Sequence, residues 1–418
     1  MSIKKRALII NCYQNDYYLS SLYEMENLLS TLDIEGELVF NFECKEISRA
    51  TFISRGMVDI SKLKMIDREI DLIVFNNDLS PLQVRNLSKA FDKEIYDRSM
   101  IIIKIFEYRA KTKEAKLQVE IASLKYNAAR LVQYDNNYDQ ITSGKGKNKG
   151  LGEKIINLRK QKIKDSIIRK EKELRQIQLN RHLNRIKRKN SLPLVTIVGY
   201  TNAGKSTLLN QLIKITNNKR KDLILEENRL FATLDTTTRL IKTNQCIPFL
   251  ITDTVGFIAN LPTHLIKSFR STFEEIVESD LIVEVIDISS EYSAVEIEIT
   301  EKIIRELTSK KIIRLYNKID ELDSNYPMVN EDELLVSLKD ENYIDDVLKL
   351  IDKNLSQFYL EVSLFIPYDQ LDVFYEIKEN HCVIDYVELE EGIKGNFKIF
   401  KNQFKKYQKY LKMLDKVR

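Results

Sequence analysis

The sequence has few of the residues that mark a secreted, disulfide-bonded or metal-binding protein. Only 4 cysteines and 3 histidines occur among 418 residues, and no two residues of either kind lie close together. Neither a disulfide framework nor a thiolate metal site is therefore indicated. No apolar run approaches the ~20 residues that span a bilayer, and the N-terminal segment is too polar for a signal peptide. We expect a cytoplasmic protein without an integral membrane segment.

Charge is distributed unevenly along the chain. Between residues 144 and 190 there are 17 Lys or Arg against 4 Asp or Glu, a net charge of +13, whereas the whole chain carries +4 and the remainder therefore −9. Such a basic block is typical of a nucleic-acid-binding protein. The alternative is a solvated, lysine-rich helix, and charge alone does not decide between the two.

Apolar patterning predicts an α/β protein of several domains. In residues 1–112, a helix-like segment at 18–32 alternates with apolar runs that predict strands at 7–12, 38–42, 71–77 and 100–106. The alternation resumes over residues 193–360, with strands expected at 194–198, 246–253, 281–287, 312–317 and 333–338. Residues 361–418 are expected to form a small C-terminal α/β domain.

Between these parts, residues 113–190 have a helical period. One heptad seam consists of Leu117, Ile121, Leu124, Ala128 and Leu131, and a partial second seam of Ile163, Ile167, Leu174 and Ile177. The glycine- and lysine-rich stretch 144–152 separates them. We predict a long helical hairpin with a basic, glycine-rich tip; the alternative is a disordered linker between domains.

Residues 199–207, GYTNAGKST, have the spacing of a phosphate-binding loop. Backbone N–H groups of such a loop wrap the α- and β-phosphates, the lysine reaches the β- and γ-oxygens, and the serine hydroxyl ligates Mg²⁺. A chance match in a structural turn is disfavoured, because a predicted strand precedes the loop and a helix follows it. The candidate nucleotide-binding residues are Gly199, Tyr200, Thr201, Asn202, Ala203, Gly204, Lys205, Ser206 and Thr207.

A second box, DTVG at 253–256, ends a predicted strand about 50 residues after the loop. Asp253 would hold Mg²⁺ through water and the Gly256 N–H would contact the γ-phosphate, with Thr254 and Val255 between them. Phe257 occupies the position of the water-orienting glutamine of Ras-type proteins. An apolar side chain cannot orient water, so we expect slow hydrolysis unless a partner completes the site. Beyond phosphate stabilisation by Lys205, no catalytic residue is assigned.

A third box, NKID at 317–320, indicates guanine. Asp320 can accept from both N1–H and the exocyclic amine, Asn317 contacts the other edge, and Lys318 lies along the base, with Ile319 completing the box. This disfavours a P-loop kinase or an ATPase and predicts GTP and GDP as substrate and product. Farther along, Ser337 and Leu338 occupy the place of the last guanine-contacting loop.

A switch loop between the first two boxes should supply a second hydroxyl to Mg²⁺. Four threonines are candidates, and position alone does not choose among them or exclude a threonine-rich structural turn. They are Thr233, Thr236, Thr237 and Thr238.

These boxes resemble the HflX family of ribosome-associated GTPases. The matching segments in the central domain are GYTNAGKST, FATLDTTTR, DTVGFI and NKID. Upstream, DLIVFNNDLSPLQVRNL, IYDRSMIIIKIFEYRA and KLQVEIASLKYNAARL resemble the family's N-terminal domain and first hairpin helix, so the resemblance runs through most of residues 1–360. In the tail, IPYDQL fits the family's small C-terminal domain.

The resemblance implies particular residues and a partner. It makes FATLD the switch box, with Thr233 as the second Mg²⁺ ligand and Phe231, Ala232, Leu234 and Asp235 beside the nucleotide. It also implies binding to the large ribosomal subunit, with Lys145, Lys147 and Lys149 at the hairpin tip reaching ribosomal RNA. Two departures are visible: the tip reads KGLGE where the family usually has RGPGE, and Leu338 replaces the usual alanine.

The sequence therefore predicts a monomeric, Mg²⁺-dependent GTP-hydrolysing switch that associates with the large subunit or the whole ribosome, with splitting or rescue of stalled ribosomes as its roles. A GTPase acting in ribosome subunit assembly would have the same boxes and charge. A non-catalytic RNA-binding factor with structural GTP is the alternative from another class, which the intact Lys205, Ser206 and Asp253 disfavour.

Overall fold

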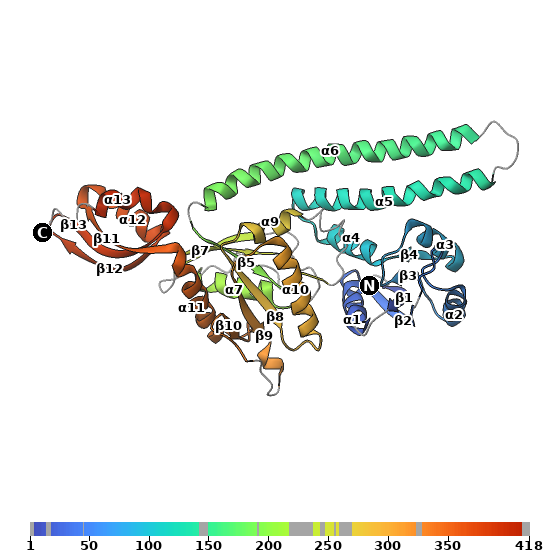
Figure 1. The fold of residues 1–418 in the computed structure, drawn as a ribbon, viewed down its shortest axis with the longest axis horizontal. Coiled ribbons are helices and arrows are strands. Elements are labelled where there is room, and N and C mark those ends of the chain that lie inside the picture. The colour runs from blue at the N-terminus through green and yellow to red at the C-terminus, as the bar shows by residue number, and fades with distance from the viewer. Residues whose placement is uncertain are drawn as a thin grey trace. The chain divides into compact units, whose positions relative to one another are not determined.

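The computed structural model describes most of the chain. The described residues are 4–13, 18–44, 46–141, 149–189, 192–216, 237–242, 247–254, 256–258, 270–322 and 328–411. They form two compact units, one containing the described residues up to Ile177 and the other nearly all of those from Gln178 onward. Each unit is built on its own parallel sheet, and the elements can be followed in Figure 1.

The first unit contains a four-stranded parallel sheet in the order β2-β1-β3-β4. Its strands are β1 (Lys5–Tyr13), β2 (Ile34–Glu43), β3 (Leu72–Phe75) and β4 (Glu94–Tyr96). The helices around it are α1 (Tyr18–Thr31), α2 (Arg55–Met65), α3 (Pro81–Phe91) and α4 (Arg98–Arg109). β1 and β3 are buried on both faces, which explains their continuous apolar runs.

The strand predicted at residues 100–106 is wrong, because this segment lies inside α4. Asp97 caps the helix by accepting a hydrogen bond from the Met100 N–H at 2.9 Å. The run Ile101–Ile103 is buried all round, so the segment lacks the polar face by which a helix is usually recognised. A short apolar run does not distinguish a buried strand from a buried helix. The strand before it is the short β4.

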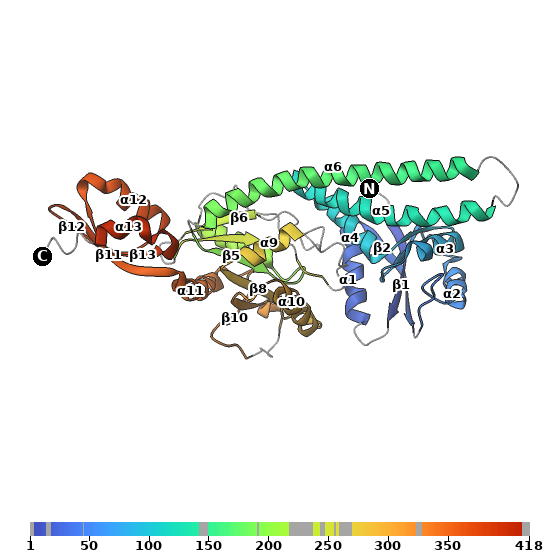
Figure 2. The same ribbon diagram turned by 45° about the horizontal axis from the view of Figure 1, so that its top comes forward.

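Two long helices follow, α5 (Lys113–Ile141) and α6 (Lys149–Lys189). They lie side by side in both views of the ribbon (Figure 2). Ion pairs between their described side chains join them, namely Lys113–Glu173, Lys125–Glu171 and Lys170–Glu120. The helical hairpin predicted from the two apolar seams is thus present, whereas its tip, 142–148, lies outside the described residues.

The second unit contains a six-stranded sheet in the order β10-β9-β8-β5-β7-β6, parallel except for the edge strand β6. Its strands are β5 (Leu194–Val198), β6 (Thr237–Ile241), β7 (Phe249–Asp253), β8 (Leu281–Asp287), β9 (Ile312–Asn317) and β10 (Glu333–Leu335). One face packs an apolar core against α7 (Lys205–Thr216) and α11 (Ile344–Leu355). The opposite face contacts α9 (Arg270–Glu278) and α10 (Ser293–Leu307).

A charged network is buried on the face that α10 covers. Glu284 in the middle of β8 is completely buried, and Arg314 of β9 donates to it at 3.0 Å. Arg314 also pairs with Glu301 of α10 and with Glu333 of β10, the latter at 3.4 Å. Burial raises the pKa of Glu284 above its usual value, and the hydrogen bond and charge of Arg314 oppose this rise, so Arg314 favours the ionised carboxylate.

The second unit also contains a three-stranded antiparallel sheet in the order β11-β13-β12. Its elements are β11 (Tyr359–Pro367), β12 (Cys382–Leu389), β13 (Gly392–Phe400), α12 (Leu371–Asn380) and α13 (Phe404–Leu411). Tyr359 anchors this sheet beside β7, because its hydroxyl donates to the Pro248 carbonyl at 2.7 Å and its ring packs against Phe400. Short 3-10 turns occur at Ile319–Glu321, Glu341–Tyr343, Ser356–Phe358, Tyr368–Gln370 and Lys401–Gln403.

The predicted fold class, a multidomain α/β protein with a mostly parallel central sheet covered on both faces, is confirmed. The domain division at 112, 190 and 360 stays a prediction; β11 begins one residue before the last of these boundaries. Among the described helices, none combines the length and the apolar composition that crossing a membrane requires.

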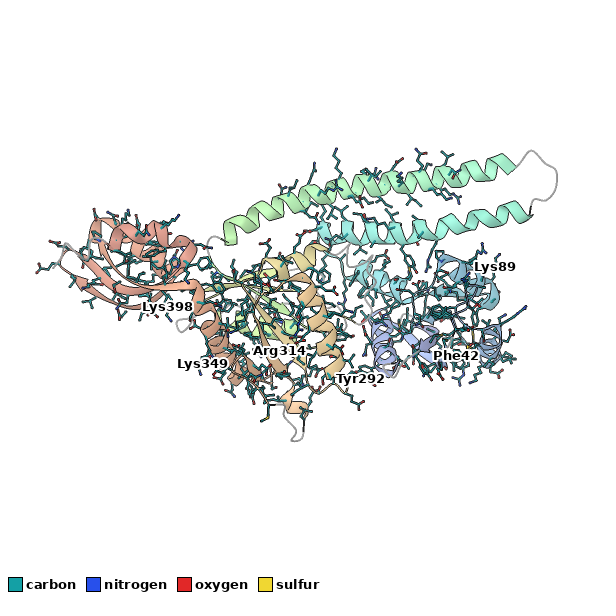
Figure 3. All side chains as sticks on the ribbon, viewed as in Figure 1. Phe42, Lys89, Tyr292, Arg314, Lys349 and Lys398 are labelled. Atoms are coloured by element: carbon teal, nitrogen blue, oxygen red, sulfur yellow. The ribbon has the colours of Figure 1, made fainter. Side chains whose placement is uncertain are left out.

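We expect Arg314→Met to destabilise the second unit by about 3 kcal/mol, because it leaves the fully buried Glu284 without its cation. Lys349→Met is the matched control, since Lys349 forms an exposed ion pair with Asp346 on the surface of α11 and its replacement should change stability by under about 0.5 kcal/mol. Figure 3 labels both positions. Urea denaturation of the full chain measures the difference, and equal stability of the two variants would contradict a structural role for the network.

Candidate nucleotide site

The loop between β5 and α7 follows a path that only glycine permits at two points. Gly199 has φ 145°, and a Cβ there would lie 2.2 Å from the Val285 carbonyl oxygen of β8. Gly204 has φ 105°, and a Cβ there would lie 2.3 Å from Asn317 Nδ2. The loop therefore runs directly against the carboxyl ends of β8 and β9, where ligands bind in open α/β sheets.

Lys205 begins α7, so its backbone lies at the positive end of the helix. Its side chain is 7% exposed and Nζ donates to the Tyr200 carbonyl at 2.6 Å, which turns the ammonium group back over the loop. Burial lowers the pKa of Lys205 to about 8, although the carboxylates of Asp253 and Glu296 oppose this. An anion held at the loop would restore the charged form.

Asp253 and Ser206 place two oxygen ligands beside the loop. Asp253 ends β7 and is completely buried, and the Ser206 hydroxyl on the first turn of α7 donates to its Oδ2 at 3.2 Å. Carboxylate and hydroxyl oxygens are the donors that Mg²⁺ prefers. The two side chains thus fit a magnesium ion, which would neutralise phosphate charge when bound.

The segment after Asp253 packs its backbone against the loop. The Phe257 N–H donates to the Gly199 carbonyl at 3.1 Å, and the Phe257 carbonyl accepts from the Thr201 N–H at 2.9 Å. The Phe257 ring is 2% exposed and stacks on Phe273, with centroids 6.1 Å apart. A Cβ at Gly256 would lie 2.9 Å from Lys205 Nζ. The Phe257 side chain is therefore part of the core, and the Phe257 backbone holds the loop by hydrogen bonds to Gly199 and Thr201.

Asn317 connects the phosphate loop with a second loop at Ser337–Lys339. Its Nδ2 donates to the Ala203 carbonyl at 2.8 Å, and its Oδ1 accepts from the Leu338 N–H at 2.9 Å. The side chain is 4% exposed. Asn317 thus braces both loops from the end of β9, in addition to the base contact expected from the sequence.

Asp320 is oriented by the second loop. Its Oδ1 accepts from the Ser337 hydroxyl at 2.7 Å and its Oδ2 from Lys339 Nζ at 3.3 Å. The Ser337 hydrogen bond, followed by that of Lys339, lowers the pKa of Asp320 and keeps it ionised. Lys318 has φ 67° and pairs with Asp287 at the end of β8. The arrangement presents an acceptor-only carboxylate, as a base with two adjacent N–H donors requires.

Two known proteins with related sequences have the same name. A protein named GTPase HflX from Caldanaerobacter subterraneus subsp. tengcongensis is 35% identical over 393 residues, which are 93% of this chain and 90% of that protein. Another GTPase HflX, from Lacrimispora saccharolytica, is 37% identical over 351 residues, 82% of this chain and 81% of that protein. The chain belongs to the HflX family of GTPases.

Models of protein families match successive parts of this HflX-family chain. The model described as "50S ribosome-binding GTPase" matches residues 194–318. The models "GTP-binding GTPase N-terminal" and "GTP-binding GTPase Middle Region" match residues 19–107 and 109–188. Among solved structures, a GTP-binding protein from Sulfolobus solfataricus in complex with GDP aligns over 84% of this chain and 99% of its own, with 22% identity and a TM-score of 0.44.

Most residues that the sequence analysis assigned to the site lie together at this edge of the HflX-family sheet. They are Gly199 to Thr207, Asp253, Gly256, Asn317 to Asp320, Ser337 and Leu338. Thr254 is turned away, because its hydroxyl donates to the Ile197 carbonyl of β5 at 2.7 Å. Residues 231–235 and Val255, and with them the proposed switch threonine, lie outside the described residues, as do Lys145 and Lys147 and the side chain of Lys149.

Sequence reasoning missed two residues of the site. Asp287 pairs with Lys318, and its position as the last residue of β8, beside the strand-end residue Asn317, was a usable signal. Gln211 of α7 donates to the Leu338 carbonyl at 3.2 Å. No local pattern marks it, since its partner is 127 residues away in the sequence.

We expect Asp320→Asn to weaken GTP binding by about 2–3 kcal/mol and to shift preference toward xanthine nucleotides, because a charge-assisted acceptor is lost. Glu321→Gln, in the same 3-10 turn, is the matched control, since Glu321 also pairs with Lys339 but not with Ser337. Titration of both variants with GTP and XTP measures the change. Unchanged GTP affinity in Asp320→Asn would show that Asp320 does not contact the base.

We also expect nucleotide binding to take up a proton at Lys205. Its pKa of about 8 without nucleotide should rise when phosphate binds, so affinity should fall as pH rises through 8. Uptake should be larger at pH 8.5 than at pH 7.5, because the uncharged fraction of Lys205 before binding increases as pH rises through its pKa. Calorimetry of GDP binding in two buffers of different ionisation heat measures this uptake. Absence of uptake at both pH values would show that Lys205 is already charged before binding.

Proposed function

We propose that this HflX-family GTPase is a GTP-controlled switch that binds the large ribosomal subunit, or the whole ribosome, through its basic hairpin. Splitting and rescue of stalled ribosomes are the roles that we propose for the bound state. The protein would act as a monomer in the cytoplasm.

The observation that carries the proposal is the charge of the hairpin. Residues 144–190 hold a net charge of +13 in a chain that is otherwise negative. Several of these cations are exposed on the described part of α6, namely Arg159, Lys162, Lys164, Arg169, Lys172 and Arg175. A rod of this charge can replace counterions along RNA phosphates. The match of residues 194–318 to a model described as "50S ribosome-binding GTPase" supports the choice of RNA.

The nucleotide site would use residues at the carboxyl edge of the six-stranded sheet. The loop from Gly199 to Thr207 would hold the phosphates, and Asp320 with Ser337 and Leu338 would read guanine. Mg²⁺ would be held by Ser206 and, through water, by Asp253, with Thr233 joining when a γ-phosphate is present.

Hydrolysis would depend on a partner. Phe257 is buried against Phe273, so it brings no hydrogen-bonding side chain to an attacking water. In Ras-type proteins a glutamine orients this water. Ribosome binding would therefore supply or position the missing group, and activity would stay low until docking occurs.

Sedimentation of the full chain with isolated subunits and intact ribosomes tests this function. With a non-hydrolysable GTP analogue, the protein should travel with the large subunit or the whole ribosome, and with GDP it should remain at the top of the gradient. Association with immature particles alone would favour a GTPase of subunit assembly. Equal association in both nucleotide states would refute a GTP-controlled switch.

We expect replacement of Lys145, Lys147 and Lys149 by Ala to lower large-subunit affinity about tenfold at 0.15 M salt and to flatten its salt dependence, because fewer phosphate counterions are displaced. Stimulated GTPase activity should fall with it, whereas GDP affinity should not change.

The matched control removes three exposed lysines from the second unit: Lys310, Lys349 and Lys353. It alters net charge equally but should leave ribosome binding intact. Equal binding by the parent and the hairpin variant would show that the tip is only a solvated loop.

A further inference from the structure

Gln211 forms a buried link between the phosphate-binding helix and the base side of the site. It lies on α7 and is 6% exposed, and its Nε2 donates to the Leu338 carbonyl at 3.2 Å. Its Oε1 accepts from Lys214 Nζ at 3.3 Å, which fixes the orientation of the amide because a lysine can only donate. The donor end of Gln211 therefore faces Leu338.

The peptide groups of Leu338 are held from two sides. Its N–H donates to Asn317 Oδ1 at 2.9 Å, and its carbonyl accepts from Gln211. Its side chain is 1% exposed within the apolar core, so it cannot shift independently of α7 and α11. The two residues that flank it, Ser337 and Lys339, are those that hydrogen-bond to Asp320. The position of Leu338 therefore determines the orientation of the Asp320 carboxylate.

We propose that Gln211 is a positioning residue for base selection. By holding the Leu338 carbonyl, it aligns Ser337 and Lys339 with Asp320, and it couples the helix that begins at Lys205 to recognition of guanine. This inference rests on the proposed role of Asp320 in reading the base. It predicts that substitution of Gln211 weakens the contacts to the guanine edge and leaves the contacts to the phosphates unchanged.

The guanine edge can be probed with inosine diphosphate, which lacks the exocyclic amine but keeps N1–H and both phosphates. A well-aligned Asp320 should bind GDP at least tenfold more tightly than IDP, because only guanine satisfies the carboxylate twice. If the loop shifts, the second contact weakens and the two affinities approach each other. Loss of phosphate contacts or of general stability would lower both affinities by the same factor.

The experiment compares the full-length protein with Gln211→Met, which keeps the length of the side chain but has no N–H donor. We expect the ratio of IDP to GDP dissociation constants to fall about tenfold, since the buried Leu338 carbonyl is left without a partner. Gln211→Glu should lower the ratio at least as much, because a carboxylate would face that carbonyl. Thr216→Val is the matched control on the same helix: among the described residues its hydroxyl donates to the Leu212 carbonyl within α7, so the ratio should not change.

Several outcomes would overturn the inference. If both Gln211 variants keep the parent ratio, or lose GDP and IDP affinity equally, Gln211 does not position the base loop. Thermal unfolding of each variant is measured alongside, and if Gln211→Met does not fold, an unchanged ratio in Gln211→Glu overturns the inference alone. Failure of the proposed function looks different: the parent protein itself would bind GDP no better than IDP or ADP.

Discussion

The phosphate loop lies so close to the ends of β8 and β9 that no side chain fits at two of its positions. Gly199 faces the Val285 carbonyl, and Gly204 faces Asn317. The close approach allows Asn317 to donate to Ala203 while it accepts from Leu338. The loop proposed to hold the phosphates and the loop proposed to contact the base thus share one bracing side chain, and a larger residue at either glycine would separate the two loops.

The sheet makes this approach possible by holding its strands in a fixed register. In the strand register, Ile197 of β5 lies opposite Asp253 of β7, and Asp287 of β8 lies opposite Asn317 of β9. Residues from four strands that are distant in sequence therefore reach the same edge. One face of the sheet is apolar and packs on α7 and α11, while the other buries the network around Arg314. The two faces differ in chemistry, and a shift of one residue would exchange them.

The geometry explains the apolar residue after the second nucleotide box. The Phe257 ring fills the space beside Phe273, and its backbone bonds to Gly199 and Thr201. A polar side chain here would lose the packing that holds this segment on the loop. The same residue that stabilises the loop is thus unable to orient water, which links the structure of the site to the partner dependence proposed for hydrolysis.

The sequence by itself determined the α/β class, the family, the helical hairpin and the order of the nucleotide boxes. These features depend on local spacing: glycines five apart, continuous apolar runs, apolar residues at helical spacing, and short motifs at strand ends. The site assignments made from those motifs stay predictions, although the structure gathers most of them at one edge. Only the tertiary structure decided that 100–106 is a buried helix, because its burial on all sides removes the periodicity that reveals a helix. It alone disclosed the bracing by Asn317 and Gln211, since those contacts join residues up to 127 positions apart that meet only when the sheet closes.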